Sequence, residues 1–291
     1  MSEIMPNRIP VLKTYKLYIG GKFERSESGR YIPYLDKSGH QVANICLASR
    51  KDFRNAVVAA RNAFGGWSGK TAYNRSQILY RMAEMMEGRS SQFIEEMVLE
   101  GSGKKEATLQ VQTAVDRLVY FAGWCDKYHQ VFGGVNPVAS AHFNFSVPEP
   151  IGVVAVLPAE RQTLAGLITA IAPVIASGNT CVVLASQLAP LSSLTFTEIV
   201  ATSDVPGGVV NVLTGTLEEL LEQFSTHMDV NAIACHGTNP ETIRTIQQNA
   251  ALNVRRVKIY TDAAIADSKC ENPYRITDFT EIKTTWHPVG D

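Results

Sequence analysis

The alternation of short apolar segments with helical segments between residues 151 and 260 most constrains the fold of this chain. The apolar segments lie at 151–157, 180–185, 209–213, 230–235 and 256–260. They are rich in branched side chains and show little polar alternation, as is typical of strands buried on both faces of a parallel sheet. The sequence therefore predicts an α/β fold with a Rossmann-type, doubly wound parallel sheet.

The residues before this region predict a short extended part followed by helices. Residues 15–35 favour strands around the turn Gly20-Gly21, and residues 1–14 are expected to form a mobile tail. Ser49, with Asp52 three residues later, predicts a capping box at the start of the first helix. A single long helix is expected over residues 106–131.

Residues 141–147 alternate strictly between polar and apolar side chains. Phe143, Phe145 and Val147 would lie on one face, which predicts a strand with one covered side. Pro148 and Pro150 are expected to end this strand.

Charge and cysteine content exclude several kinds of protein. The formal net charge is -1, so the chain lacks the broad positive field that would attract nucleic acid or an anionic membrane. No apolar run approaches the roughly 20 residues that cross a bilayer, and the first residues lack a signal-peptide pattern. We therefore expect a cytoplasmic protein with no nucleic-acid or membrane partner.

The five cysteines show no metal-binding or redox spacing, because no two are separated by only two residues, so no metal site is predicted. Cys125, Cys181 and Cys235 lie in apolar stretches and are expected to be buried, reduced thiols. Cys270 is isolated and is expected to be a loop or surface thiol.

Several segments together resemble the aldehyde dehydrogenase superfamily, in its order and spacing. They are LYIGGKF at 17–23, AVVAARNAF at 56–64, YFAGWCDKY at 120–128, EPIGVV at 149–154, SGNT at 177–180, VPGGVVN at 205–211 and NVRRV at 253–257. The segment TEIKTT at 280–285 resembles the family's last strand, although full-length members have a whole catalytic domain between these last two segments. The resemblance thus implies that the catalytic domain is absent, as in the non-catalytic second half of two-domain members.

The resemblance also implies a division of the chain. Residues 15–136 and 151–265 correspond to an NAD-binding-like domain, and residues 137–150 and 276–291 correspond to the family's oligomerisation flap. Phe143, Phe145 and Trp286 are the candidate interface residues in this flap. The alternative is that these aromatic side chains only pack on the chain's own sheet.

The family's catalytic positions are altered in this sequence. The general base, a glutamate in the family, is Tyr260, a poor base at neutral pH because the pKa of tyrosine is about 10. The oxyanion-holding asparagine corresponds to Glu160 or Arg161, depending on a one-residue shift. A carboxylate there would repel an oxyanion, whereas an arginine would stabilise one. The nucleophilic cysteine belongs to the missing domain, so no catalytic residue is predicted.

Cofactor binding is expected to be weak at most. The glycine pattern G-x-G-x-x-G is absent, and the family's Lys-Pro-x-Glu, which holds the adenine ribose, is replaced by residues 184–187, Leu-Ala-Ser-Gln. His236 is expected to be a solvated or capping histidine. The candidate residues for weak NAD(P) binding are Pro158, Gln187, Gly215, Gly237 and Thr238.

Three functions remain open from the sequence. The first is a non-catalytic structural or regulatory subunit that assembles with itself or with an active aldehyde dehydrogenase. The second is a weak nucleotide-binding regulatory module. The third is an NAD(P)-dependent oxidoreductase acting on aldehydes, with a catalytic domain borrowed from a partner.

Overall fold

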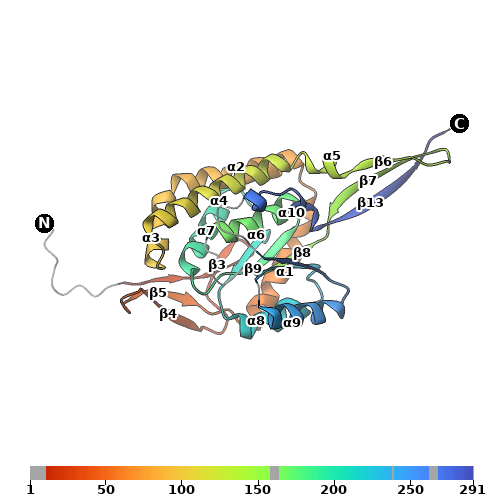
Figure 1. Ribbon diagram of the computed structural model, residues 1–291. Coiled ribbons are helices and arrows are strands. Elements are labelled where there is room, and N and C mark those ends of the chain that lie inside the picture. Colours follow the sequence, from red (N-terminus) through yellow and green to blue (C-terminus); the bar gives the residue numbers. More distant parts are fainter. Residues whose placement is uncertain (1–10, 158–163, 238, 262–267, 291) are drawn as a thin grey trace.

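The computed structural model describes residues 11–157, 164–237, 239–261 and 268–290 (Figure 1). A seven-stranded sheet forms its centre, in the order β12-β11-β8-β9-β10-β2-β3. Five strands are parallel: β8 (Val153–Leu157), β9 (Thr180–Leu184), β10 (Val210–Leu213), β11 (Ala232–His236) and β12 (Arg256–Tyr260). Two antiparallel strands, β2 (Leu17–Ile19) and β3 (Lys22–Glu24), follow β10, and β3 forms that edge of the sheet. The predicted doubly wound sheet is confirmed, and its strand bounds differ by only a few residues from the predicted ones.

Helices cover both faces of this sheet. One face packs against α1 (Arg50–Ser68), α8 (Leu217–Thr226) and α9 (Pro240–Ala251). The other packs against α6 (Leu164–Ala176) and α7 (Pro190–Thr202). The helices α2 (Ala72–Gly88), α4 (Lys104–Trp124) and α3 (Ser90–Leu99) form an outer layer on these two. Alternate residues of β8, β9, β10 and β11 enter the two hydrophobic cores, which explains why these four strands are almost entirely apolar. The edge strand β12 is only half-buried and carries Arg256 and Lys258.

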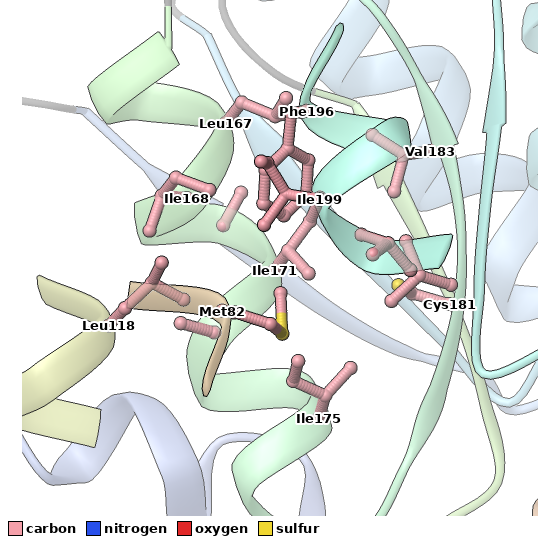
Figure 2. Close-up of a cluster of buried hydrophobic side chains, with 14 of the residues drawn as sticks. Met82, Leu118, Leu167, Ile168, Ile171, Ile175, Cys181, Val183, Phe196 and Ile199 are labelled. Carbon is pink, nitrogen blue, oxygen red and sulfur yellow. The ribbon is translucent and has the colours of Figure 1, made fainter. Parts of the chain in front are cut away.

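Helix α6 is the centre of the larger core. All thirteen of its residues are buried, because α4, α2, α7 and the sheet surround it. Figure 2 shows Ile168, Ile171 and Ile175 of this helix among the side chains of Met82, Leu118, Phe196 and Ile199. Within the described residues, no helix is both long and apolar enough to cross a membrane.

The predicted helix starts are confirmed where a side chain caps them. Ser49 Oγ accepts from the amides of Lys51 and Asp52, and Asp52 accepts in return from the amide of Ser49 at 2.8 Å. The expected single helix over 106–131 is wrong, because α4 ends at Trp124 and a separate helix, α5 (Tyr128–Phe132), follows. The break directs Tyr128 into the core, where its hydroxyl donates to the Ser177 carbonyl oxygen at 3.2 Å.

A three-stranded sheet projects from the body and is called the flap below (Figure 1). It consists of β6 (Gly134–Asn136), β7 (His142–Pro150) and β13 (Thr280–Pro288), with β7 in the middle. The strand ends at Pro150 as expected, but it does not stop at Pro148, since β7 pairs with β13 as far as Pro150. β6 pairs with β7 only as far as Ser146. The side of β7 that faces away from β13 is therefore unpaired at both prolines. A proline nitrogen that points to this unpaired side removes no hydrogen bond from the sheet.

A second small sheet, in the order β1-β5-β4, lies near the start of the described chain. It contains β1 (Lys13–Tyr15), β5 (Gln41–Cys46) and β4 (Tyr31–Leu35). The predicted tail over residues 1–14 is wrong at Lys13 and Thr14, which pair with Ala43 and Asn44. A short 3-10 helix (Ser268–Cys270) and α10 (Tyr274–Thr277) connect the region after β12 to β13.

Candidate functional site

The order of the parallel strands places the topological switch point of the sheet, where open α/β sheets form their ligand crevice, at the carboxyl ends of β8 and β11. The chain runs outward from β8 through β9 to β10, then returns to β11 on the other side of β8. Ligands of open α/β sheets bind at such a switch point. Gly237 directly follows β11 at this position, and a Cβ built on it would meet no atom within 4 Å. Its backbone is therefore open to a ligand.

The structure brings two of the cofactor candidates together. Gln187, after β9, donates from its amide nitrogen to the carbonyl oxygen of Gly215, after β10, at 3.1 Å. This hydrogen bond holds the Gln187 side chain against the neighbouring loop. Four predicted site residues lie outside the described residues. They are the cofactor candidates Pro158 and Thr238, and Glu160 and Arg161 at the position of the family's asparagine.

Tyr260 ends β12, and its phenol is enclosed by other side chains. Its hydroxyl donates to Asp278 Oδ2 at 2.7 Å. The ring lies 4.7 Å from the His236 ring, centroid to centroid, and the Arg275 guanidinium lies over its face at 4.4 Å. His236 is 2% exposed, so the prediction of a solvated histidine is wrong: its ring packs against the Tyr260 ring at an interplanar angle of 33°.

Two further charged side chains of β12 bind the same C-terminal segment. Lys258 Nζ lies 2.6 Å from Asp278 Oδ1, and Arg256 donates to the Thr280 carbonyl and to Glu281 at 2.5 and 2.6 Å. The alternate residues Arg256, Lys258 and Tyr260 thus attach one face of the edge strand to residues 278–281. We call these contacts, together with the His236 and Arg275 contacts to the Tyr260 ring, the β12 clamp.

No pattern in the sequence indicates the clamp, because Arg275 and Asp278 belong to no motif. Glu100 was missed as well. It follows α3, and Oε1 accepts from the amides of Leu191 and Ser192 at 2.5 and 3.1 Å, at the start of α7. Ala189 is the sequence signal for such a residue. It is the N-cap residue before Pro190 and has no side-chain acceptor, so another residue has to accept from the first amides of α7.

No described cysteine is placed as an accessible nucleophile. All five thiols are buried and none forms a disulfide. Burial raises the pKa of Cys125 and Cys181 to about 12 and that of Cys235 to about 11, which confirms the predicted buried thiols. The expected surface position of Cys270 is wrong: it is 4% exposed, with Arg275 Nη2 3.9 Å from its sulfur. Within the described chain, no three His, Cys, Asp or Glu side chains gather as metal ligands.

The three candidate interface residues lie on two faces of the flap. Phe143 and Phe145 are in ring contact at 5.6 Å on one face. Trp286 is the cross-strand partner of Asn144 and therefore lies on the opposite face. Phe143 is 46% exposed and Trp286 is 57% exposed. These two aromatic side chains therefore remain accessible, and their own sheet does not bury them.

A mostly parallel, doubly wound sheet with helices on both faces defines an α/β protein with a Rossmann-type fold. The sequence profile of the aldehyde dehydrogenase family matches residues 23–263, and the chain belongs to this family. It is 30% identical to human cytosolic 10-formyltetrahydrofolate dehydrogenase over 266 residues, which cover 88% of this chain and 29% of that protein. It is 31% identical to the putative aldehyde dehydrogenase DhaS of Bacillus subtilis over 251 residues, 84% of this chain and 50% of that protein.

Solved structures share the fold over the same part of the chain. A putative aldehyde dehydrogenase from Burkholderia cenocepacia superposes with a TM-score of 0.78 at 29% identity. A variant of Staphylococcus aureus betaine aldehyde dehydrogenase in complex with NAD+ superposes with a TM-score of 0.80 at 24% identity. Each match covers 84% of this chain and 50% of the other. The chain thus spans about half the length of these structures.

Proposed function

We propose that this chain is a non-catalytic member of the aldehyde dehydrogenase family that acts as a structural or regulatory subunit. The observation that most supports the proposal is the β12 clamp at Tyr260. The residue at the family's base position is a phenol whose hydroxyl is hydrogen-bonded to a carboxylate and whose ring is covered on its face by Arg275. A side chain held in this way is not positioned to remove a proton from a substrate.

The burial of the cysteines and the short connection between β12 and β13 support the same proposal. A thiolate, not a thiol, attacks a carbonyl carbon, and burial raises the pKa values of Cys125, Cys181 and Cys235 far above neutral pH. Only residues 261–279 separate β12 from β13. This connection is much too short for a domain, because domains contain at least about 50 residues.

The residues after β9 do not fit tight dinucleotide binding. Residues 184–188 contain no ionisable side chain, and the Gln187 amide is hydrogen-bonded to Gly215. A charge-assisted hydrogen bond contributes roughly 1.5–3 kcal/mol, so losing two of them weakens binding by about two to four powers of ten. We infer that NAD(P) binds weakly at most.

The flap supports assembly with another subunit. β13 is an edge strand of nine residues, and its unpaired backbone N–H and C=O groups form a template on which a strand of another chain can pair. Phe143 and Trp286 give both faces of the flap accessible apolar surface. We propose that the flap contacts a second copy of this chain or a full-length aldehyde dehydrogenase.

The proposal is tested by assaying the purified chain with NAD+ or NADP+ and a series of aliphatic and aromatic aldehydes. We expect no aldehyde-dependent increase in reduced cofactor above the protein-free rate, with a full-length aldehyde dehydrogenase as the positive control. Turnover that scales with the chain and disappears in Cys270→Ala would contradict the proposal. Turnover that persists in this variant points instead to a contaminating enzyme, which a second purification step removes before the assay is repeated.

A weak nucleotide-binding regulatory module is the second candidate function, supported by the open backbone of Gly237 at the switch point. Titration with NAD+ distinguishes it from a purely structural subunit. A dissociation constant in the micromolar range that rises in Gly237→Val would favour the regulatory module. Binding only at millimolar concentration, unchanged in this variant, would favour the structural one.

A further inference from the structure

Arg75 of α2 is a buried cation with no carboxylate partner among the described residues. It is 3% exposed. Its Nε donates to the Ala176 carbonyl at 3.3 Å, and its Nη1 donates to the Ser68 and Lys70 carbonyls at 3.4 and 2.6 Å. Burying a charged group costs several kcal/mol in effective terms. Carbonyl dipoles offset part of this cost, but they carry no formal negative charge.

A cavity of about 520 Å³ adjoins Arg75. Its wall contains the end of α1, the start of α2, part of α5 and the last residues of β7. Pro150 and Ser177 belong to this wall and lie a few residues before β8 and β9. The cavity is therefore at the amino ends of the parallel strands, at the opposite edge of the sheet from the crevice beside Gly237.

The charges around this cavity are unbalanced. Lys70 lines it, is half-buried and has no ion pair in the part of the chain that the structure describes. His129 also lines it, and burial together with the nearby Arg75 charge lowers the pKa of His129, so its imidazole is neutral at pH 7. The one carboxylate in the wall, Glu149, is 3.1 Å from Lys283 Nζ. Two cations, Arg75 and Lys70, thus line the cavity without a carboxylate partner among the residues that the structure describes.

The first turn of α2 adds hydrogen-bond donors at the same place. Thr71 Oγ1 accepts from the amide of Asn74, while the amides of Ala72 and Tyr73 have no intrahelical acceptor, as at any helix start. Ala72 lines the cavity, and α2 continues for 17 residues. The positive end of the helix dipole therefore favours an anion at this end of the cavity.

We propose that this cavity, lined by Lys70, Ala72, Arg75 and His129, binds a small phosphate-bearing anion. Phosphate carries between one and two negative charges at neutral pH, which matches the two unpaired cations. Its oxygens accept hydrogen bonds from lysine, from a guanidinium and from helix amides. The cavity volume accommodates a free phosphate as well as a phosphate on a small organic molecule.

Isothermal titration calorimetry tests this site, with inorganic phosphate and phenyl phosphate added to the full chain at constant ionic strength. We expect saturable binding of at least one of them. Lys70→Gln should weaken binding about tenfold, because a charge-assisted hydrogen bond is lost. Glu149→Gln should tighten it, because a repelling carboxylate is removed. Lys22→Gln, which removes an exposed lysine far from the cavity, is the matched control and should leave binding unchanged.

Saturable binding that Lys70→Gln weakens and Lys22→Gln does not would support the site, and tighter binding of phenyl phosphate would identify the ligand as an organic phosphate. Absence of saturation with both probes overturns the proposal. So does an equal loss of affinity in the two lysine variants. Excess NAD+ should not displace the phosphate, and displacement would place the phosphate in the Gly237 crevice instead.

Discussion

At Tyr260, one hydrogen bond to Asp278 connects the carboxyl end of β12 to the segment before β13. We expect Tyr260→Phe to lower the free energy of unfolding by about 1.5 kcal/mol, because a partly buried hydrogen bond to a charged group is lost. Urea unfolding followed by circular dichroism measures the change. Tyr31→Phe is the control, since Tyr31 is 61% exposed. Equal stability of the Tyr260→Phe variant and the wild type would show that the clamp contributes little.

A second substitution, Tyr260→Glu, places the glutamate of the family at this position. A carboxylate at this position would lie beside Asp278 and repel it, so we expect Tyr260→Glu to be less stable than Tyr260→Phe. We also expect it to show no aldehyde oxidation, because all five cysteines are buried and none is exposed to attack a substrate carbonyl. Aldehyde-dependent cofactor reduction by Tyr260→Glu would show that only the base had been missing.

Glu100 makes the stability of the chain depend on pH near neutrality. Burial raises its pKa from 4.5 to about 7. Between these two values the folded chain binds more protons than the unfolded chain, so stability falls as pH rises from about 4.5 to 7. We expect this contribution to be at most about 3 kcal/mol. It should be absent in Glu100→Gln, which cannot titrate.

Urea unfolding of the wild type and of Glu100→Gln at several pH values measures this contribution. The difference between the two free energies of unfolding should change between pH 4.5 and 7 and be constant below pH 4. Glu96 has a raised pKa as well, but it is present in both proteins and cancels. A pH-independent difference would show that Glu100 ionises normally.

At the scale of the elements, the start of α1 is fixed by two residues with unequal roles. Ser49 caps the helix through its hydroxyl, so we expect Ser49→Ala to cost about 1 kcal/mol of stability. Asp52 is 3% exposed and also accepts from Ser26 Oγ and the Glu27 amide at 2.7 and 3.1 Å. Asp52→Ala should therefore cost more, about 2–4 kcal/mol, because buried donors lose their acceptor. Thermal unfolding compares the variants, and an equal loss in both would contradict this difference.

The sequence predicted the elements whose signal is local and missed those that depend on distant contacts. The strands from β8 to β11 are short apolar runs, and the capped start of α1 is recognisable from Ser49 and Asp52. The break after Trp124 depends on the burial of Tyr128 against Ser177, 49 residues away. The β12 clamp likewise joins residues from three separate segments, and no periodicity or motif in the sequence indicates such a contact.

At the scale of the whole molecule, three regions are spatially separate. The crevice beside Gly237 lies at the carboxyl ends of the parallel strands, and the proposed anion cavity lies at their amino ends. The flap projects from the body (Figure 1). The body is stabilised by two cores that do not include the flap's exposed aromatic side chains. Substitutions of these side chains should therefore change assembly without unfolding the chain.

Self-assembly through the flap is the prediction that belongs to this scale. Sedimentation velocity over a range of protein concentrations should show an oligomer. Phe143→Glu should weaken the association at least about tenfold, because burying an unpaired charge at an interface is costly. Trp286→Glu, on the opposite face, shows whether one or both faces are covered. Tyr73→Glu on α2 is the matched control, since Tyr73 is 67% exposed and lies on the body.

The two possible partners give different results in this experiment. If the wild-type chain is monomeric at tens of micromolar, the flap does not join copies of this chain, and a full-length aldehyde dehydrogenase is the remaining proposed partner. Mixing the two proteins should then produce a heavier species that Phe143→Glu or Trp286→Glu prevents and Tyr73→Glu does not. If the chain is monomeric and also does not bind the full-length enzyme, this result contradicts the subunit function, because nothing would then cover the open edge of β13 and the aromatic faces of the flap.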